Sequence, residues 1–167
     1  MRLKTILHPT DYDEPSNLAL RYAVELAHDY KADLIVLHSV ATLGPEKLTY
    51  GEAISGKQPE AFRQRLWEEI HQIRSPDPEV TLEYVLSEED PVSAIVHLAN
   101  QRNCDLIVLG SHGKHGWKRL VEGSTAELVV RRASCPVLVI KNANAVPGNG
   151  GSRSKGTEMH PGQISGN

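Results

Sequence analysis

The chain has 167 residues and a formal net charge of −3; 40% of its residues are hydrophobic and 23% are charged. This size and composition suit one soluble domain with a hydrophobic core, and the lysines and arginines form no basic stripe for generic nucleic-acid binding. No run approaches the roughly 18 apolar residues of a membrane span. The first nine residues lack the apolar core of a signal peptide. We therefore expect a cytoplasmic protein that binds neither nucleic acid nor membrane, with Cys104 and Cys135 reduced.

The first forty residues predict a strand, a helix and a second strand. A short apolar run predicts a strand over Leu3–His8. Helical spacing predicts a following helix with one apolar face, formed by Ala19, Ala23, Leu26, Ala27 and Tyr30. Asp13–Pro15 suits the start of that helix, where acidic residues are favoured and proline is tolerated. The continuous apolar run Leu34–Leu37 is typical of a strand buried on both faces of a parallel sheet.

The next hundred residues repeat this alternation. Three further apolar faces predict helices: Phe62, Leu66, Ile70 and Ile73, then Val92, Ile95, Val96 and Ala99, and finally Ala126, Val129, Val130 and Ala133. Ser75–Pro78 should end the first of these helices, and Asp90–Pro91 should begin the second. Three more strands are predicted over Val80–Leu86, Leu106–Leu109 and Val137–Ile140.

Strand and helix thus alternate four times before a closing strand. This order predicts a single α/β domain over residues 1–141, with a five-stranded, mostly parallel sheet and right-handed crossovers. Residues 41–59 form a connection that is long for a compact domain. Residues 142–167 are rich in glycine and contain few large apolar side chains, so we expect them to form a disordered tail.

Two segments that follow predicted strands have unusual compositions. Ligands of open α/β sheets bind beyond the carboxyl ends of the strands, which is where Pro9–Asp11 and Gly110–Thr125 lie. The glycines of the second segment would let backbone N–H groups approach anionic oxygens; they are Gly110, Gly113 and Gly123. The same segment leads into a helix N-terminus, which favours phosphate. A structural alternative remains open, because Gly110 could form a turn and Ser124 with Glu127 could form a capping box.

The spacing Gly110-x-x-Gly113, nine residues, Gly123-Ser124 resembles the ATP-binding signature of the universal stress protein family. The resemblance extends over residues 1–141 and includes Pro9–Asp11 and Ser134–Ile140. It implies an open sheet of order 3-2-1-4-5 with helices on both faces, of the Rossmann-like type found in the adenine nucleotide alpha hydrolase-like fold. Strands one and four would then be neighbours, and the two unusual segments would meet.

The resemblance also implies an ATP site without dedicated catalytic residues. The implied nucleotide-binding residues are Pro9, Thr10, Asp11, Ser39, Val40, Leu109, Gly110, His112, Gly113, Gly123, Ser124, Thr125 and Ala126. The first three would line adenine and ribose, and the last four would hold the phosphates. Ser39 stands where the family usually places an apolar residue against adenine, and Val40 can substitute for it.

Metal binding by the protein itself is not expected. The strand-end residues His8 and His38 are interpreted as hydrogen-bonded structural residues, and Mg²⁺ or Mn²⁺ would arrive with the nucleotide phosphates. Residues 51–58 match the spacing of a P-loop, but Gln58 replaces its metal-binding serine or threonine. We interpret this match as coincidence.

The favoured function is therefore that of an ATP-binding regulatory or stress-response protein that acts as a homodimer. The resemblance implies that the last strands pair antiparallel across a two-fold axis, through Val137, Leu138, Val139 and Ile140. The alternative is a slow ATP hydrolase or nucleotidyl transferase on the same fold. The loop offers His112, His115 and Asp11 for such chemistry, but no acidic motif that would hold a metal.

Overall fold

Five parallel strands form one sheet in the computed structural model, which describes residues 2–40, 60–111 and 124–141. The strands are β1 (Thr5–Pro9), β2 (Asp33–Ser39), β3 (Leu82–Ser87), β4 (Leu106–Ser111) and β5 (Val137–Lys141). They lie in the order β3-β2-β1-β4-β5, and each neighbouring pair is parallel. The expected strand order is confirmed.

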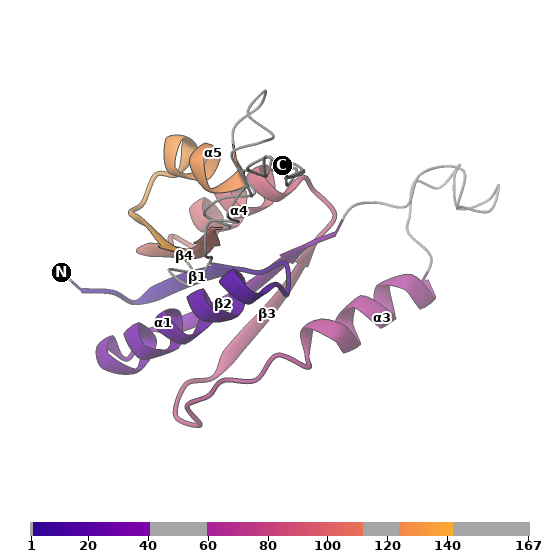
Figure 1. Cartoon of the computed structure of the whole chain (residues 1–167), viewed down its shortest axis with the longest axis horizontal. Coiled ribbons are helices and arrows are strands. Elements are labelled where there is room, and N and C mark those ends of the chain that lie inside the picture. Colours follow the sequence, from indigo (N-terminus) through magenta and orange to yellow (C-terminus); the bar gives the residue numbers. More distant parts are fainter. Residues whose placement is uncertain (1, 41–59, 112–123, 142–167) are drawn as a thin grey trace, which may run out of the picture.

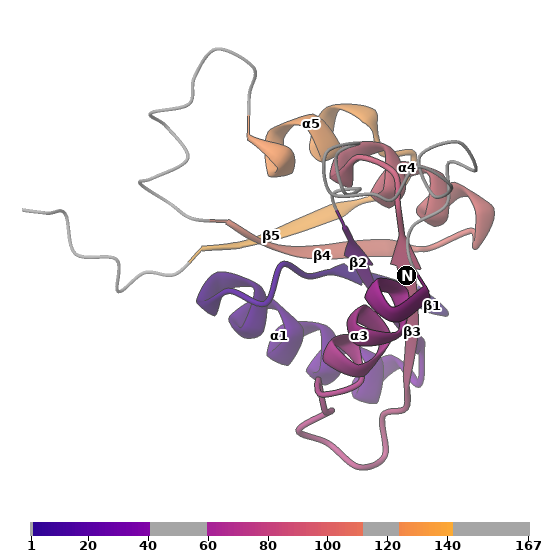
Figure 2. The same cartoon turned by 90° about the vertical axis from the view of Figure 1, so that its right-hand side faces the viewer.

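Helices cover both faces of this sheet. Within the described ranges they are α1 (Glu14–Tyr30), α3 (Glu60–Ile70), α4 (Pro91–Gln101) and α5 (Thr125–Arg132). Figure 1 shows α1 in front of the strands, and Figure 2 shows α1 and α3 on one side of β4 and β5 and α4 and α5 on the other. The expected doubly wound architecture is therefore confirmed.

Side-chain caps begin the helices where the sequence predicts their starts. The carboxylate of Asp13 accepts a hydrogen bond from the N–H of Ser16 at 2.7 Å, in the first turn of α1. Asp90 accepts a hydrogen bond from the N–H of Ser93 at 3.1 Å, in the first turn of α4. Each bond satisfies a backbone donor that has no partner within its helix.

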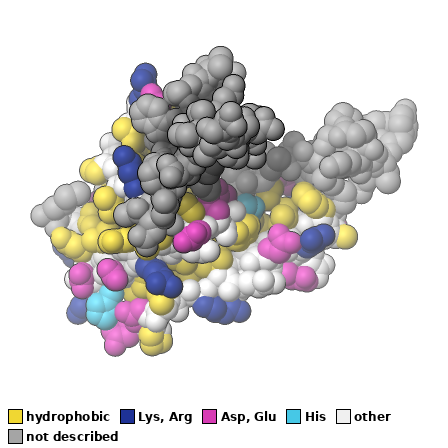
Figure 3. Space-filling view, in the orientation of Figure 1, with side chains coloured by type: hydrophobic (Ala, Val, Ile, Leu, Met, Phe, Trp, Pro, Cys, Tyr) yellow, Lys and Arg dark blue, Asp and Glu magenta, His cyan; other side chains and the backbone are white. Residues whose placement is uncertain are grey.

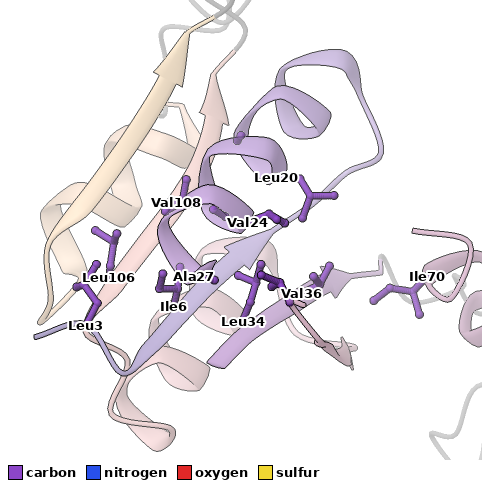
Figure 4. Close-up of a cluster of buried hydrophobic side chains, with 13 residues drawn as sticks. Leu3, Ile6, Leu20, Val24, Ala27, Leu34, Val36, Ile70, Leu106 and Val108 are labelled. Atoms are coloured by element: carbon purple, nitrogen blue, oxygen red, sulfur yellow. The ribbon is translucent and has the colours of Figure 1, made fainter. Parts of the chain in front are cut away.

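Two apolar clusters pack on opposite faces of the sheet. Neighbouring residues of a strand point to opposite sides, so Ile6 of β1 belongs to the cluster under α1 and Leu7 to the cluster under α4 and α5. Figure 4 shows Val24 and Ala27 of α1 among the strand residues of the first cluster, and Ile70 joins them from the end of α3. The central strands are thus buried on both faces, as their continuous apolar runs predict.

Helix α3 and strand β3 differ at their ends from the sequence prediction. The helix ends at Ile70 rather than at Ile73, because the chain then tightens into a turn in which the N–H of Ile73 donates to the carbonyl of Ile70. The hydroxyl of Tyr84 donates to the carbonyl of Ile73 at 2.7 Å, which attaches this turn to the sheet. Strand β3 begins at Leu82, two residues after the predicted Val80.

Two residues predicted on buried helix faces are exposed. Val130 is 52% exposed, because the short helix α5 buries only Ala126 and Val129. Tyr30 is the last residue of α1 and is 47% exposed. These exposed residues show that a helical period overestimates the buried face near the end of an element.

The described surface and helices agree with the composition. In Figure 3 the basic side chains on the visible face lie singly among acidic ones and form no continuous stripe. A membrane-crossing helix is absent from the part of the chain that the structure describes. The predicted tail at 142–167 and the long connection at 41–59, with its P-loop-like spacing, lie outside that part.

Candidate functional site

The carboxyl ends of β1 and β4 separate from each other at the centre of the sheet. Their register pairs Ile6 with Leu106 and Leu7 with Ile107 and then stops, although both strands continue. From this point β1 leads to α1 on one face, while β4 precedes α5 on the other. Such a divergence leaves a crevice at the strand ends, which is the usual ligand position in open α/β sheets.

His8 lies where the two strands separate. Its Nδ1–H donates to the carbonyl oxygen of Val108 on β4 at 2.9 Å. The ring is 1% exposed. Burial lowers the pKa of His8 to about 4, although the bond to Val108 and the charge of Asp11 oppose this shift. The imidazole is therefore neutral near pH 7, and His8 is a hydrogen-bonded structural residue, as its position predicts.

The loop after β1 is fixed by bonds to Thr10. The N–H of Thr10 donates to the carbonyl of Leu37 at 2.8 Å. Its Oγ1 accepts hydrogen bonds from Ser16 Oγ at 2.8 Å and from the N–H of Tyr12 at 3.1 Å. The Thr10 hydroxyl thus serves the loop itself, while Asp11 is exposed beside it and accepts a bond from the N–H of Asp13 at 3.4 Å.

His38 attaches the same loop to β2. Its Nδ1–H donates to the carbonyl of Thr10 at 2.8 Å, and its ring centroid lies 4.4 Å from that of Tyr12. Sequence reasoning predicted a structural bond for His38 but did not include Tyr12 or Ser16 in the site. Ser16 is buried in the first turn of α1, and no pattern in the sequence indicates its bond to Thr10.

Ser39 and Val40 take different positions at the end of β2. The hydroxyl of Ser39 donates to the carbonyl of Glu89 at 2.6 Å, which fixes the connection between β3 and α4. Val40 is buried, and its N–H donates to the carbonyl of Ser87 at 2.9 Å. The Ser39 hydroxyl is therefore engaged by the protein, and Val40 is the apolar residue at this strand end.

Gly110 permits a close approach between β4 and α1. A Cβ atom at this position would lie 2.5 Å from the carbonyl carbon and oxygen of Pro15 and 2.7 Å from the nitrogen of Ser16. Such distances are too short for any side chain. The protein's own packing therefore requires glycine here. Gly110 lies within β4 and pairs with Ile140, so it does not form the turn that the structural alternative allowed. Leu109, the preceding residue, is buried in the cluster under α4 and α5.

Helix α5 begins with the predicted cap. Ser124 Oγ accepts a hydrogen bond from the N–H of Glu127 at 3.2 Å, and Ala126 belongs to the same apolar cluster as Leu109. Thr125 is exposed in the first turn. The remaining predicted site residues, His112, Gly113 and Gly123, lie outside the described ranges.

Metal ligands and reactive thiols do not assemble in the ranges that the structure describes. No group of three His, Cys, Asp or Glu residues there could hold a metal ion. Burial raises the pKa of Cys104 to about 11 and also raises the pKa of Cys135. Both thiols are therefore protonated near pH 7, a state that disfavours nucleophilic attack.

The geometry defines a doubly wound α/β protein whose strands β1 and β4 diverge at their carboxyl ends. Residues 2–141 match the Universal stress protein family, and the chain belongs to this family. The chain is 31% identical over 140 residues to universal stress protein MJ0531 of Methanocaldococcus jannaschii, a match that covers 83% of this chain and 82% of that protein.

Two solved structures share the fold. The structure of MJ0577, a universal stress protein of the same organism, superimposes with a TM-score of 0.65 at 26% identity and covers 87% of this chain and 100% of that one. A universal stress protein in complex with cAMP superimposes with a TM-score of 0.58 at 23% identity, covering 84% and 98% of the two chains. The second likeness concerns the fold alone.

Proposed function

We propose that this protein binds ATP reversibly at the β1/β4 crevice and acts in the cytoplasm as a small regulatory or stress-response protein. The observation that carries the proposal is the end of β1–β4 pairing after Leu7 and Ile107, beside the loop that presents Asp11. Family membership supports it. A protein of the same fold has been solved with cAMP, so the fold can accommodate an adenine nucleotide.

The described residues fit such a ligand. Pro9, half-buried at the end of β1, offers apolar surface for adenine, and the buried Val40 follows the end of the adjacent strand β2. Asp11, exposed on a loop that Thr10 fixes, is placed to accept hydrogen bonds from ribose hydroxyls. The resemblance assigns the phosphates to His112, Gly113, Gly123 and the first residues of α5. Mg²⁺ or Mn²⁺ would be carried by those phosphates.

Calorimetric titration of the full chain with Mg-ATP tests the proposal. We expect Asp11→Ala to weaken ATP binding at least tenfold, about 1.4 kcal/mol, because ribose loses a charged acceptor. Asp33→Ala is the matched control, since Asp33 is an exposed aspartate at the start of β2, the opposite end of the strands. An Asp11→Ala variant that binds ATP as tightly as Asp33→Ala would disprove the assignment. Phosphate release in the same samples separates binding from slow hydrolysis.

The proposed functional unit is a homodimer that pairs its β5 strands. Strand β5 lies at the edge of the sheet in the order β3-β2-β1-β4-β5. Its side chain Leu138 is 37% exposed, which is unusual for a leucine in a strand of a parallel sheet. A two-fold pairing of such edges gives the unpaired backbone groups of both copies hydrogen-bond partners through one shared surface.

A further inference from the structure

Thr10, the residue before Asp11, is bonded to strand β2 through both of its backbone groups. Its N–H donates to the carbonyl of Leu37 at 2.8 Å. Its carbonyl accepts a hydrogen bond from the Nδ1–H of His38 at 2.8 Å. Leu37 and His38 are consecutive residues near the end of β2, which lies in the interior of the sheet. A well-supported strand therefore holds Thr10 on both sides.

The bond from His38 fixes the peptide group that leads into Asp11. A peptide group is planar, so the carbonyl oxygen of Thr10 and the N–H of Asp11 belong to one rigid unit. The imidazole that holds this oxygen therefore sets the direction in which the chain enters Asp11.

The residue after Asp11 also contacts His38. Tyr12 has a φ of 65°, a backbone conformation that residues other than glycine rarely adopt. Its N–H donates to Thr10 Oγ1 at 3.1 Å. Its ring centroid lies 4.4 Å from that of His38, with the ring planes tilted by 44°. His38 thus contacts the loop on both sides of Asp11, at the Thr10 carbonyl before it and at the Tyr12 ring after it.

Ser16 supports the same loop in a different way. Its hydroxyl donates to Thr10 Oγ1 at 2.8 Å, so it holds the side chain of Thr10 rather than the peptide group. Ser16 belongs to α1, whereas His38 belongs to the sheet. Of these two bonds, only that of His38 acts on the peptide group next to Asp11.

We propose that His38 is a positioning residue of the nucleotide site, which orients Asp11 towards the ribose by holding the Thr10 carbonyl. This inference rests on the proposed function, in which Asp11 accepts hydrogen bonds from ribose hydroxyls. It predicts that His38 contributes to ATP affinity through Asp11. A histidine that only stabilised the domain would leave the contribution of Asp11 to binding unchanged.

Two substitutions separate the hydrogen bond from the ring contact. His38→Phe keeps an aromatic ring against Tyr12 but has no donor for the Thr10 carbonyl. His38→Asn has no ring, but its amide nitrogen is attached to Cγ, as Nδ1 is in histidine, and can donate to the same oxygen. In calorimetry we expect His38→Phe to weaken ATP binding at least fivefold, about 1 kcal/mol, and His38→Asn to stay within about twofold of the wild type. An equal loss in His38→Asn would overturn the role of the hydrogen bond.

His71 provides a matched control. Its Nδ1–H donates to the carbonyl of Trp67 at 2.7 Å, and its ring centroid lies 4.5 Å from that of Tyr84. These contacts repeat those of His38, but they join α3 to β3 and do not involve the loop after β1. His71→Phe should therefore bind ATP as the wild type does. An equal loss of affinity in His71→Phe and His38→Phe would contradict a specific role of His38.

A double-mutant cycle with Asp11→Ala tests the route of the effect. If His38 acts by orienting Asp11, the double variant Asp11→Ala/His38→Phe should bind ATP as weakly as Asp11→Ala alone. Independent effects would multiply, and the double variant would then lose both factors. Multiplied losses, in a protein whose wild type binds ATP, would overturn this inference and leave the proposed function intact.

Amide hydrogen exchange without nucleotide gives a readout that is independent of ATP. The N–H of Tyr12 should exchange at least about tenfold faster in His38→Phe than in the wild type, because the loop opens locally more often. His71→Phe should leave this rate unchanged. A wild type that does not bind ATP would contradict the proposed function, and the exchange rates would still decide whether His38 holds the loop. An unchanged rate in His38→Phe would overturn the positioning role.

Discussion

At Gly110, strand β4 and the first turn of α1 approach so closely that a methyl group has no room. The atoms that a Cβ would meet belong to the backbone of Pro15 and Ser16, and the Ser16 N–H is fixed by its bond to Asp13. These atoms cannot rotate away as a flexible side chain could. The contact therefore links the end of β4 to the first turn of α1 through the packing of the backbone.

We expect Gly110→Ala to lower the free energy of unfolding by about 1–3 kcal/mol, the usual cost of overpacking. Urea denaturation measures the change. Ser111→Ala, one residue further along the same strand, should change stability by less than about 0.5 kcal/mol. If the two variants proved equally stable, the close contact at Gly110 would not limit the side chain.

His8 makes stability depend on pH. Its pKa is about 4 in the folded chain and 6.5 as the ordinary value, so the unfolded chain binds the proton first as the pH falls. The contribution of His8 to stability is complete above pH 6.5 and is lost progressively towards pH 4. The loss is about 2 kcal/mol at pH 5, since one pKa unit corresponds to about 1.4 kcal/mol.

Urea denaturation at pH 7.5 and pH 5 measures this loss in the wild type. His8→Asn should be less stable at pH 7.5 but should lose much less between the two pH values. His97→Asn, at an exposed position of α4, should retain the wild-type difference. An equal pH dependence in His8→Asn and the wild type would contradict the role of His8.

Among the elements, the start of α5 has both a structural and a functional interpretation. Ser124 caps the helix by accepting from Glu127, and the resemblance places the same residue at the phosphates. Ser124→Ala should cost about 1 kcal/mol of stability through loss of the cap, whereas Ser124→Asp preserves an acceptor and should cost little. The aspartate should repel phosphate and weaken ATP binding at least tenfold, measured by calorimetry. If Ser124→Asp bound ATP with wild-type affinity, the helix cap would be the only role of Ser124.

The elements themselves were predictable because their signals are local. The apolar run Leu34–Leu37 indicates a buried strand without reference to any other segment, and Asp90–Pro91 indicates a helix start. The end of α3 at Ile70 was missed because the bond from Tyr84 to the following turn comes from another element. The existence of an element follows from its period, while its last residue depends on tertiary contacts.

The strand ends that the candidate site would use were predictable, but the hydrogen bonds around them were not. The sequence places Pro9–Asp11 and Gly110 at the ends of two strands, and the strand order makes these strands neighbours. The sequence does not show that the Ser39 hydroxyl bonds to the carbonyl of Glu89, fifty residues away, or that the Ser16 hydroxyl bonds to that of Thr10. Side chains of similar polarity can face a ligand or the protein, and only the packing of the whole domain decides between them.

At the scale of the whole molecule, the domain and the segment beyond it should be separable. We propose that residues 142–167 contribute little to the fold, because they are rich in glycine and poor in large apolar side chains. Truncation after Lys141 should leave the thermal midpoint and ATP affinity unchanged. A fall of several degrees would show that this segment packs on the domain.

The last prediction concerns assembly through the outer edge of β5. This strand pairs with β4 on one side, and none of the described strands pairs with its other side. Unpaired edges of apolar, β-favouring residues tend to associate, and a two-fold pairing satisfies two such edges at once. Leu138 on β5 and Val130 on the adjacent helix α5 are exposed apolar residues that a second copy could cover.

Light scattering at micromolar concentration should give twice the 18.4 kDa mass of the chain. Leu138→Lys should shift the mass towards that of one chain, because a charge at the pairing edge opposes association. Tyr22→Lys, which introduces the same charge at an exposed position of α1, should leave the dimer intact. A wild-type mass of 18.4 kDa would contradict pairing through β5, and a dimer that survives Leu138→Lys would place the interface on another surface.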